Sequence, residues 1–182
     1  FALAAVSSVR REVWQVGPVG ALWDEPGLEG AQGGLSAALP SLTAAGQARA
    51  LVIQALLAQG SGQFTQRQLQ ASDPAQAIIA PLLVAHASLA NSAGPFGYGL
   101  INGDPVPDEH LRVHHLPPGP HEVSLATAGY PAVMNTLAAT ERRLQELLRA
   151  DPLLITRFPY VRPHRPDHEG YADRAYARVR IW

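Results

Sequence analysis

The sequence predicts an α+β protein in which helices pack on largely antiparallel sheets. Segments that favour strands or helices follow one another in the order strands, helix pair, strands, helix, strand. Turns rich in Gly and Pro separate neighbouring strand segments, which is typical of hairpin-connected sheets and not of a doubly wound parallel sheet. The length of 182 residues fits a single domain over residues 1–182 with one core.

The first 24 residues carry Val, Trp and Leu in short runs that are broken at residues 10–12 and 17–18. This pattern predicts two or three short antiparallel strands joined by tight turns. Trp14 and Trp23 are expected in the core. Residues 25–40 are rich in Gly and Pro, so we expect a surface connection there, with a lid as the less favoured alternative.

The spacing of apolar residues changes to a helical period at residue 41. Ser41 or Thr43 is expected to cap a helix whose apolar positions form one stripe and which ends before Gly60. A second helical stretch is predicted over residues 65–70.

A third helical segment is expected between residues 73 and 91. Asp73 can cap it and Pro74 can occupy its first position, while Pro81 is expected to kink or restart it. Its apolar residues form a broad face that includes His86, which we interpret as a core histidine rather than a ligand.

Three strands are predicted in the middle of the chain. Residues 94–102 alternate small and apolar residues, which favours a strand packed closely against a neighbour. Residues 111–116 and 122–127 predict two further strands, separated by a turn at 117–120.

An amphipathic helix is predicted from Thr136 to a stop at Asp151–Pro152, with leucines on one face and charged residues on the other. Residues 159–170 are expected to form a loop. The alternating apolar residues of 171–182 predict a final strand.

The composition excludes several chemistries. All 14 basic residues are Arg, so no catalytic or phosphate-loop Lys is present, and the absence of Cys excludes thiol catalysis and Cys-ligated metals. The 15 acidic residues bring the formal net charge to -1, so we expect no nucleic-acid partner. No apolar run approaches the roughly 20 residues of a membrane span and residues 1–9 lack a signal-peptide pattern, so we expect no membrane partner and a cytoplasmic location.

Two histidine pairs have the i, i+4 spacing that brings metal ligands together on a helix: His110 with His114, and His164 with His168. The first pair falls in a strand-like segment, where the residues would stand about 13 Å apart, and the second falls in a Pro-rich loop. We therefore expect solvated histidines rather than a metal site.

The most specific motif is the strand segment 124–127, which ends in the turn Thr127-Ala128-Gly129 and precedes the amphipathic helix. It resembles the strand ending in Thr-Asp-Gly or Ser-Asp-Gly that carries a metal-binding aspartate in type 2C metal-dependent protein phosphatases. A divergent bacterial group related to that fold is more similar still, along nearly the whole chain. The similar segments are 12–17 (EVWQVG), 98–107 (YGLINGDPVP), 126–131, 151–153 and 171–176 (YADRAY).

The resemblance implies a layered α-β-β-α sandwich, with two antiparallel sheets flanked by helices. Aspartates at the strand ends of that family hold two Mg²⁺ or Mn²⁺ ions, which would deliver a hydroxide to a phosphoserine or phosphothreonine. The family's first metal-binding carboxylates would lie upstream of Phe1. The resemblance therefore implies a phosphatase-like domain that is a fragment, incomplete at its N-terminus.

This sequence departs from the family at the positions that carry metal chemistry. Ala128 stands where the family has an aspartate, and Ala172 stands before Asp173 where the last strand begins with a metal-binding Asp. The early Gly-Asp element is here Gly17 followed by Pro18. The motif-equivalent positions are Gly17, Thr127, Ala128, Gly129, Ala172 and Asp173.

These departures favour a degenerate phosphatase-like domain without catalysis, with a binding or regulatory role and a phosphoprotein or protein partner. An alanine side chain has no ligand atom, so no metal cofactor is expected. Asp173 is the remaining candidate for weak metal coordination, but a local ion pair with Arg174 or Arg178 at the start of the last strand is the favoured interpretation.

A second hypothesis is an active serine/threonine phosphoprotein phosphatase that depends on Mg²⁺ or Mn²⁺ and hydrolyses phosphoric monoesters. Its ligands would come from an upstream segment together with Asp104, Asp108, Asp167 or Asp173. Metal binding and phosphoester turnover separate the two hypotheses.

Overall fold

The computed structural model describes residues 1–24, 34–35, 39–59 and 64–182. It has an α+β fold with antiparallel sheets, as predicted. The strands are β1 (Leu3–Ser7), β2 (Glu12–Val16), β3 (Val19–Trp23), β4 (Gly34–Leu35), β5 (Leu111–His115), β6 (His121–Thr127), β7 (Ala132–Val133) and β8 (Tyr176–Ile181). The helices are α1 (Pro40–Ala58), α2 (Gln66–Ala71), α3 (Ala75–Ala87) and α4 (Leu137–Ala150), and a 3₁₀ turn covers Asp108–His110.

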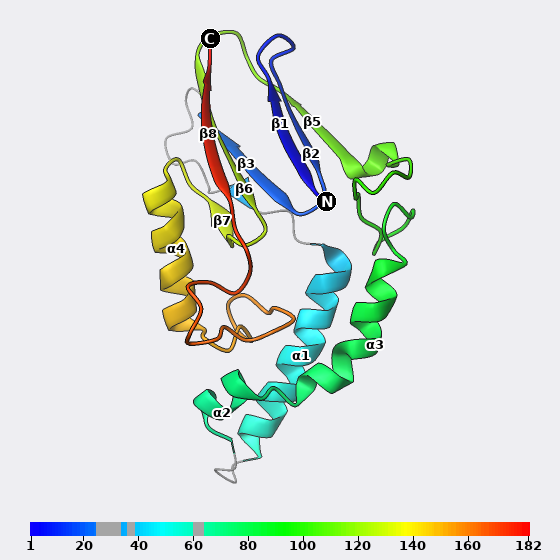
Figure 1. Ribbon diagram of the computed structural model, residues 1–182, viewed down its shortest axis with the longest axis vertical. Helices are drawn as coiled ribbons and strands as arrows, with labels where there is room; N and C mark the ends of the chain where they lie inside the picture. Colours follow the sequence, from blue (N-terminus) through cyan, green and yellow to red (C-terminus); the bar gives the residue numbers. More distant parts are fainter. Residues whose placement is uncertain (25–33, 36–38, 60–63) are drawn as a thin grey trace.

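Two three-stranded sheets lie face to face in the upper half of the molecule (Figure 1). One has the strand order β1-β2-β5 and the other β3-β6-β8, while β4 pairs with β7 in a small third sheet. Alternation along β6 places Val123 on the face between the large sheets and Ala126 on the opposite face. The buried apolar side chains between the sheets are Val13, Leu116, Val123 and Ile181.

α4 covers the outer face of the β3-β6-β8 sheet. Its buried leucines, among them Leu144 and Leu148, pack with Leu22 of β3 and Ala126 of β6. α4, the β3-β6-β8 sheet and the β1-β2-β5 sheet therefore form three layers. α1 and α3 pack against each other below the sheets in Figure 1, so the four-layer sandwich stays a prediction.

Most of the predicted elements are present. β1, β2 and β3 fall within the first 24 residues, and β5, β6, β8 and the four helices match predicted segments. Trp14 and Trp23 are only partly buried, which corrects their placement in the core. Of the connection expected at 25–40, residues 25–33 and 36–38 lie outside the described part of the chain.

The strand predicted over residues 94–102 is wrong, because the segment forms turns with one isolated bridge. Its backbone groups form hydrogen bonds with a side chain instead of with a neighbouring strand. Asn91 Oδ1 accepts from the N–H of Leu100 (2.8 Å), and Asn91 Nδ2 donates to the carbonyl of Leu100 (2.9 Å). The expected close packing is present, since a Cβ on Gly99 would lie 2.9 Å from Val16 Cγ1.

α1 begins at Pro40 without a side-chain cap, so the predicted capping by Ser41 or Thr43 is wrong. Proline has no N–H to satisfy, which makes a cap less necessary at this helix start. Ser41 Oγ instead bonds to His86 Nδ1 (2.8 Å), and this ring stacks on Tyr98 with centroids 4.4 Å apart. Burial lowers the pKa of His86, but the residue is only partly buried, which corrects its placement in the core.

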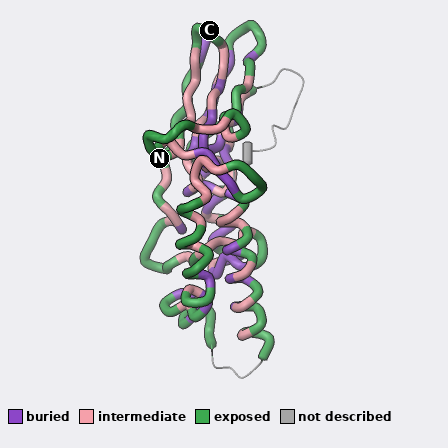
Figure 2. The backbone as a smooth tube through the Cα atoms, turned by 90° about the vertical axis from the view of Figure 1, so that its right-hand side faces the viewer, coloured by how far each residue is buried: buried purple, intermediate pink, exposed green. Residues whose placement is uncertain are grey.

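α3 leaves most of its apolar surface exposed. Among its residues only Ala75 and Ile79 are buried, whereas Ile78, Leu82 and Val84 are exposed. The proline inside the helix does not end it. Figure 2 shows that buried residues lie mainly along the middle of the molecule and that the turns at its upper end are exposed.

Candidate functional site

The turn after β6 and the segment before β8 lie side by side. The N–H of Thr127 donates to the carbonyl of Ala175 (3.1 Å), and Thr127 Oγ1 accepts from the N–H of Ala175 (2.9 Å). The Tyr171 hydroxyl donates to the carbonyl of Ala128 (3.0 Å). These bonds join two segments that are far apart in the sequence.

Gly129 makes this contact possible, because a Cβ at this position would lie 2.2 Å from the carbonyl oxygen of Asp173. Gly17 lies elsewhere, in the β2–β3 turn with φ +78°, where a Cβ would lie 2.9 Å from the carbonyl oxygen of Gly99. The structure therefore brings together all the predicted motif positions except Gly17: Thr127, Ala128, Gly129, Ala172 and Asp173.

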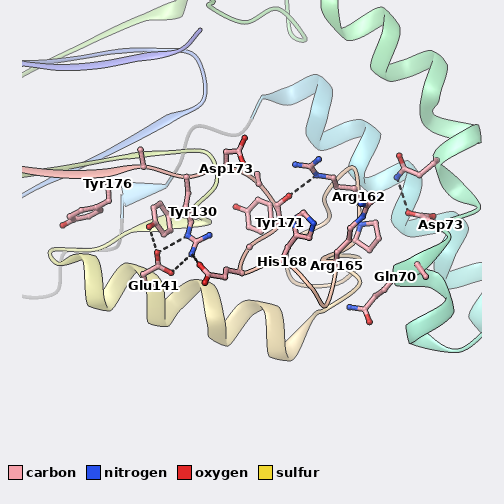
Figure 3. A pocket seen from close by; sticks show the side chains of 18 of the residues that line it. Gln70, Asp73, Tyr130, Glu141, Arg162, Arg165, His168, Tyr171, Asp173 and Tyr176 are labelled. Carbon is pink, nitrogen blue, oxygen red and sulfur yellow. Dashed lines mark hydrogen bonds and ion pairs between the residues drawn. The ribbon is translucent and has the colours of Figure 1, made fainter.

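A pocket of about 980 Å³ lies beside this contact. Its walls come from the α2–α3 junction, from the N-terminal part of α4 and from the irregular segment 162–175 (Figure 3). Ala172 and Asp173 line it together with charged side chains of both signs. The volume falls within the range of small-ligand sites.

Tyr130, Glu141 and Arg174 form a hydrogen-bonded cluster at one end of the pocket (Figure 3). Glu141 Oε1 accepts from the Tyr130 hydroxyl (2.6 Å) and from Arg174 Nε (3.0 Å). The bond from Arg174 lowers the pKa of Glu141, although burial opposes this effect. Burial raises the pKa of Tyr130, and the bond to Glu141 adds to the rise. Arg174 Nη2 also lies 3.5 Å from Glu169 Oε2, so its charge is neutralised from two sides.

Asp173 is exposed and forms no ion pair within the described residues, so the expected pairing with Arg174 or Arg178 is wrong. Arg174 pairs with Glu141, and Arg178 pairs with Glu122. Within 1–24, 34–35, 39–59 and 64–182, no group of three or more His, Asp or Glu side chains is arranged to hold a metal ion.

The other carboxylates named as candidate ligands are distributed over the molecule. Asp104 Oδ2 accepts from Asn102 (2.7 Å), and Asp108 opens the 3₁₀ turn before β5, on the side of the β1-β2-β5 sheet (Figure 1). Asp173, in contrast, precedes β8 of the other large sheet. Asp167 lies in the loop before β8, with its Oδ2 3.8 Å from His168 Nε2.

Neither histidine pair forms a joint site in the described structure. His110 Nε2 bonds to a backbone carbonyl (2.8 Å), whereas His114 packs against Trp23 with ring centroids 5.0 Å apart. His164 Nε2 bonds to the backbone carbonyl of His168 (2.8 Å). His110, His114 and His164 are partly buried and only His168 is exposed, which corrects the expectation of solvated histidines.

Arg49 of α1 is fully buried and supports one wall of the pocket. Its Nε lies 2.5 Å from Asp73 Oδ2, and Asp73 itself lines the pocket. Its Nη1 donates to three backbone carbonyls, those of Leu153, Leu154 and Tyr160. The sequence contains one signal of this role, the position of Arg49 among apolar residues on the inner stripe of the helix.

Asp151 ends α4 and holds the start of the irregular segment. Its carboxylate accepts hydrogen bonds from four consecutive backbone N–H groups, those of residues 155–158, at 2.8 to 3.3 Å. Burial raises the pKa of this carboxyl, but the four hydrogen bonds outweigh burial and lower it. The segment that continues toward the pocket therefore starts from a fixed backbone.

No family model, curated protein or solved structure matches this chain. In the part of the chain that the structure describes, no helix has the length and apolar character needed to cross a membrane. The geometry of the pocket and the residues at the two adjacent strand ends are therefore the basis for a function.

Proposed function

We propose that this chain is a degenerate phosphatase-like domain that binds a protein partner and performs no metal-dependent catalysis. A cytoplasmic location is part of the same proposal. Its main support is the contact between Thr127-Ala128-Gly129 and Ala172-Asp173 beside the pocket. The type 2C phosphatases that the chain resembles have metal-binding aspartates at these strand ends, and here alanine stands at both positions.

The two alanines remove ligand atoms and leave the contact between the strand ends in place. Mg²⁺ and Mn²⁺ require oxygen ligands held by rigid elements. The side chains of Ala128 and Ala172 supply none, and the side chain of Asp173 supplies at most two of the roughly six oxygens in an octahedral Mg²⁺ site. A pocket with this architecture and few metal ligands is suited to binding rather than to hydrolysis.

Calorimetric titration with Mn²⁺ and hydrolysis of p-nitrophenyl phosphate test this function. We expect no Mn²⁺ binding at micromolar concentration and no turnover above the buffer blank. The double substitution Ala128→Asp with Ala172→Asp is expected to raise Mn²⁺ affinity only when the upstream carboxylates implied by the resemblance are also supplied.

Micromolar Mn²⁺ binding with phosphoester turnover, both abolished by Asp173→Ala, would establish the active phosphatase instead. Glu146→Ala is the matched control, because Glu146 is an exposed carboxylate on α4 outside the pocket lining. It should leave any metal binding unchanged.

A further inference from the structure

Two arginines line the end of the pocket away from the Tyr130–Glu141–Arg174 cluster (Figure 3). Arg162 Nε donates to the carbonyl of Tyr171 (3.0 Å), which orients the guanidinium group, and neither Nη atom has an acceptor among the described residues. Arg165 is exposed and pairs with no carboxylate in the described part of the chain. A guanidinium group in this situation matches the paired oxygens of a carboxylate or a phosphoryl group.

Side chains from the helices hold the backbone around these arginines. Gln76 Nε2 donates to the carbonyl of Val161 (2.6 Å), and Gln70 Nε2 donates to the carbonyl of His164 (2.9 Å). The two bonds attach the loop to the α2–α3 region on both sides of Arg162. A ligand that meets residues positioned in advance loses less conformational entropy on binding.

The acidic residues of the pocket limit the negative charge that a ligand can carry. Glu141 and Glu169 neutralise Arg174, and Asp173 adds an exposed carboxylate. A carboxylate brings one negative charge, whereas a phosphoryl group brings about 1.5 to 2 near neutral pH. Repulsion from the acidic side chains therefore disfavours a phosphoryl group more than a carboxylate.

We propose that this pocket binds an acidic peptide segment, in which a Glu or Asp side chain of the partner pairs with Arg162 and Arg165. The proposal rests on the binding role proposed above and adds the class of ligand. The volume of about 980 Å³ exceeds the size of one side chain, so residues next to the acidic one also enter the pocket. The partly exposed ring of Tyr176 offers them aromatic surface at the opposite end.

Fluorescence polarisation with a labelled hexapeptide of Ala and Ser around a single glutamate tests the proposal. We expect saturable binding that weakens in high salt, and binding about tenfold weaker for the same peptide with glutamine in place of glutamate. Arg162→Gln and Arg165→Gln should each weaken the glutamate peptide about tenfold. Arg142→Gln is the control, because Arg142 is exposed on α4 outside the pocket lining and its loss should change affinity by less than about twofold.

Several outcomes overturn the proposal: no binding of the glutamate peptide, equal binding of both peptides, or unchanged binding in Arg165→Gln. Tighter binding of the peptide with phosphoserine in place of glutamate also overturns the assigned ligand class. Circular dichroism of each variant verifies that it folds. If the wild-type protein binds no glutamate peptide and hydrolyses no phosphoester, only the acidic-peptide ligand is refuted. If it hydrolyses phosphoesters, the proposed non-catalytic role is refuted.

Discussion

At the scale of single residues, Arg49 and Asp151 organise the irregular segment that follows α4. Arg49 binds backbone carbonyls of this segment, and Asp151 binds its backbone N–H groups. The two side chains thus supply hydrogen bonds that a helix or a strand would otherwise provide. Both are buried charges with direct partners, since Asp73 lies beside Arg49 and four N–H groups surround Asp151.

Asp151→Asn is expected to lower the free energy of unfolding by about 1–3 kcal/mol at neutral pH, because the amide keeps one of the two acceptor oxygens. Folding lowers the pKa of Asp151, so its stabilising contribution is complete above the unfolded-state pKa and is lost as the pH falls through the folded-state pKa. The difference between wild type and variant should therefore shrink in acid. Urea denaturation at a series of pH values measures it.

Asp167→Asn is the matched control, because the side chain of Asp167 is 77% exposed. We expect it to change the free energy of unfolding by less than about 0.5 kcal/mol. A difference between wild type and Asp151→Asn that stays constant from neutral to acid pH would contradict the role assigned to the carboxylate.

The sequence predicts these residue roles poorly, because their partners are distant or formed by backbone. The carbonyl of Tyr160 that accepts from Arg49 lies 111 positions away along the chain, and no local pattern specifies such a contact. Asp151 is predictable only as the end of a helix, since Pro152 follows it. Its four N–H partners depend on the conformation of a segment without periodic structure.

At the scale of elements, α4 shows the closest agreement between sequence pattern and structure. Thr136 is its N-cap, with Oγ1 accepting from the N–H of Ala139 (3.1 Å). Leu144 and Leu148 are buried as the periodicity predicts. Leu137 is about half exposed, because it lies in the first turn at the pocket.

Thr136→Ala is expected to lower the free energy of unfolding by about 1 kcal/mol, because an N-terminal N–H of α4 loses its acceptor. Urea denaturation of wild type and variant measures this change. Thr156→Ala is the control, since Thr156 is exposed, and should be neutral within about 0.5 kcal/mol. Equal losses in the two variants would show that the cap contributes nothing specific.

The segment 94–102 shows where element prediction fails. Small and apolar residues in alternation indicate close packing, which Gly99 confirms, but they do not determine what satisfies the backbone. The side chain of Asn91 bonds to Leu100, and the backbone of Phe1 bonds to that of Ile101. The side chain of Asn91 and the backbone before β1 take the place of a neighbouring strand, and the local sequence pattern predicts neither contact.

At the scale of the whole molecule, the candidate site exists because β6 is the central strand of its sheet. Strand β8 pairs with β6 and thereby places the segment before β8 against the turn after β6. The family resemblance singles out both segments, 126–131 and 171–176, from the sequence alone. The pocket beside them could not be predicted, because its walls come from the α2–α3 junction, α4 and the segment 162–175, which only the tertiary fold brings together.

Gly129→Ala tests this long-range contact. The new Cβ would lie 2.2 Å from the carbonyl oxygen of Asp173, and this backbone atom cannot move without displacing the start of β8. We expect a loss of about 1–3 kcal/mol in the free energy of unfolding, measured by urea denaturation.

Gly170→Ala is the matched control for the same chemical change. Its Cβ would lie 2.8 Å from Arg174 Nη1, a side-chain atom that forms no hydrogen bond with the described residues and can shift more easily than backbone. We expect a loss that is clearly smaller than that of Gly129→Ala. If both variants lose the same stability, the contact between the two strand ends is not the tight one described.

The pairing of β3 with β6 also bears on how the chain is made. Trp23 lies opposite Val123, so β3 leaves the ribosome a hundred residues before its partner. At about 5–20 residues per second, this delay is about 5–20 s. The β1–β2 hairpin spans only residues 3–16 and needs no such wait. The nascent chain therefore carries β3 without its partner strand until β6 is synthesised, and during that time β3 is open to pairing with other chains.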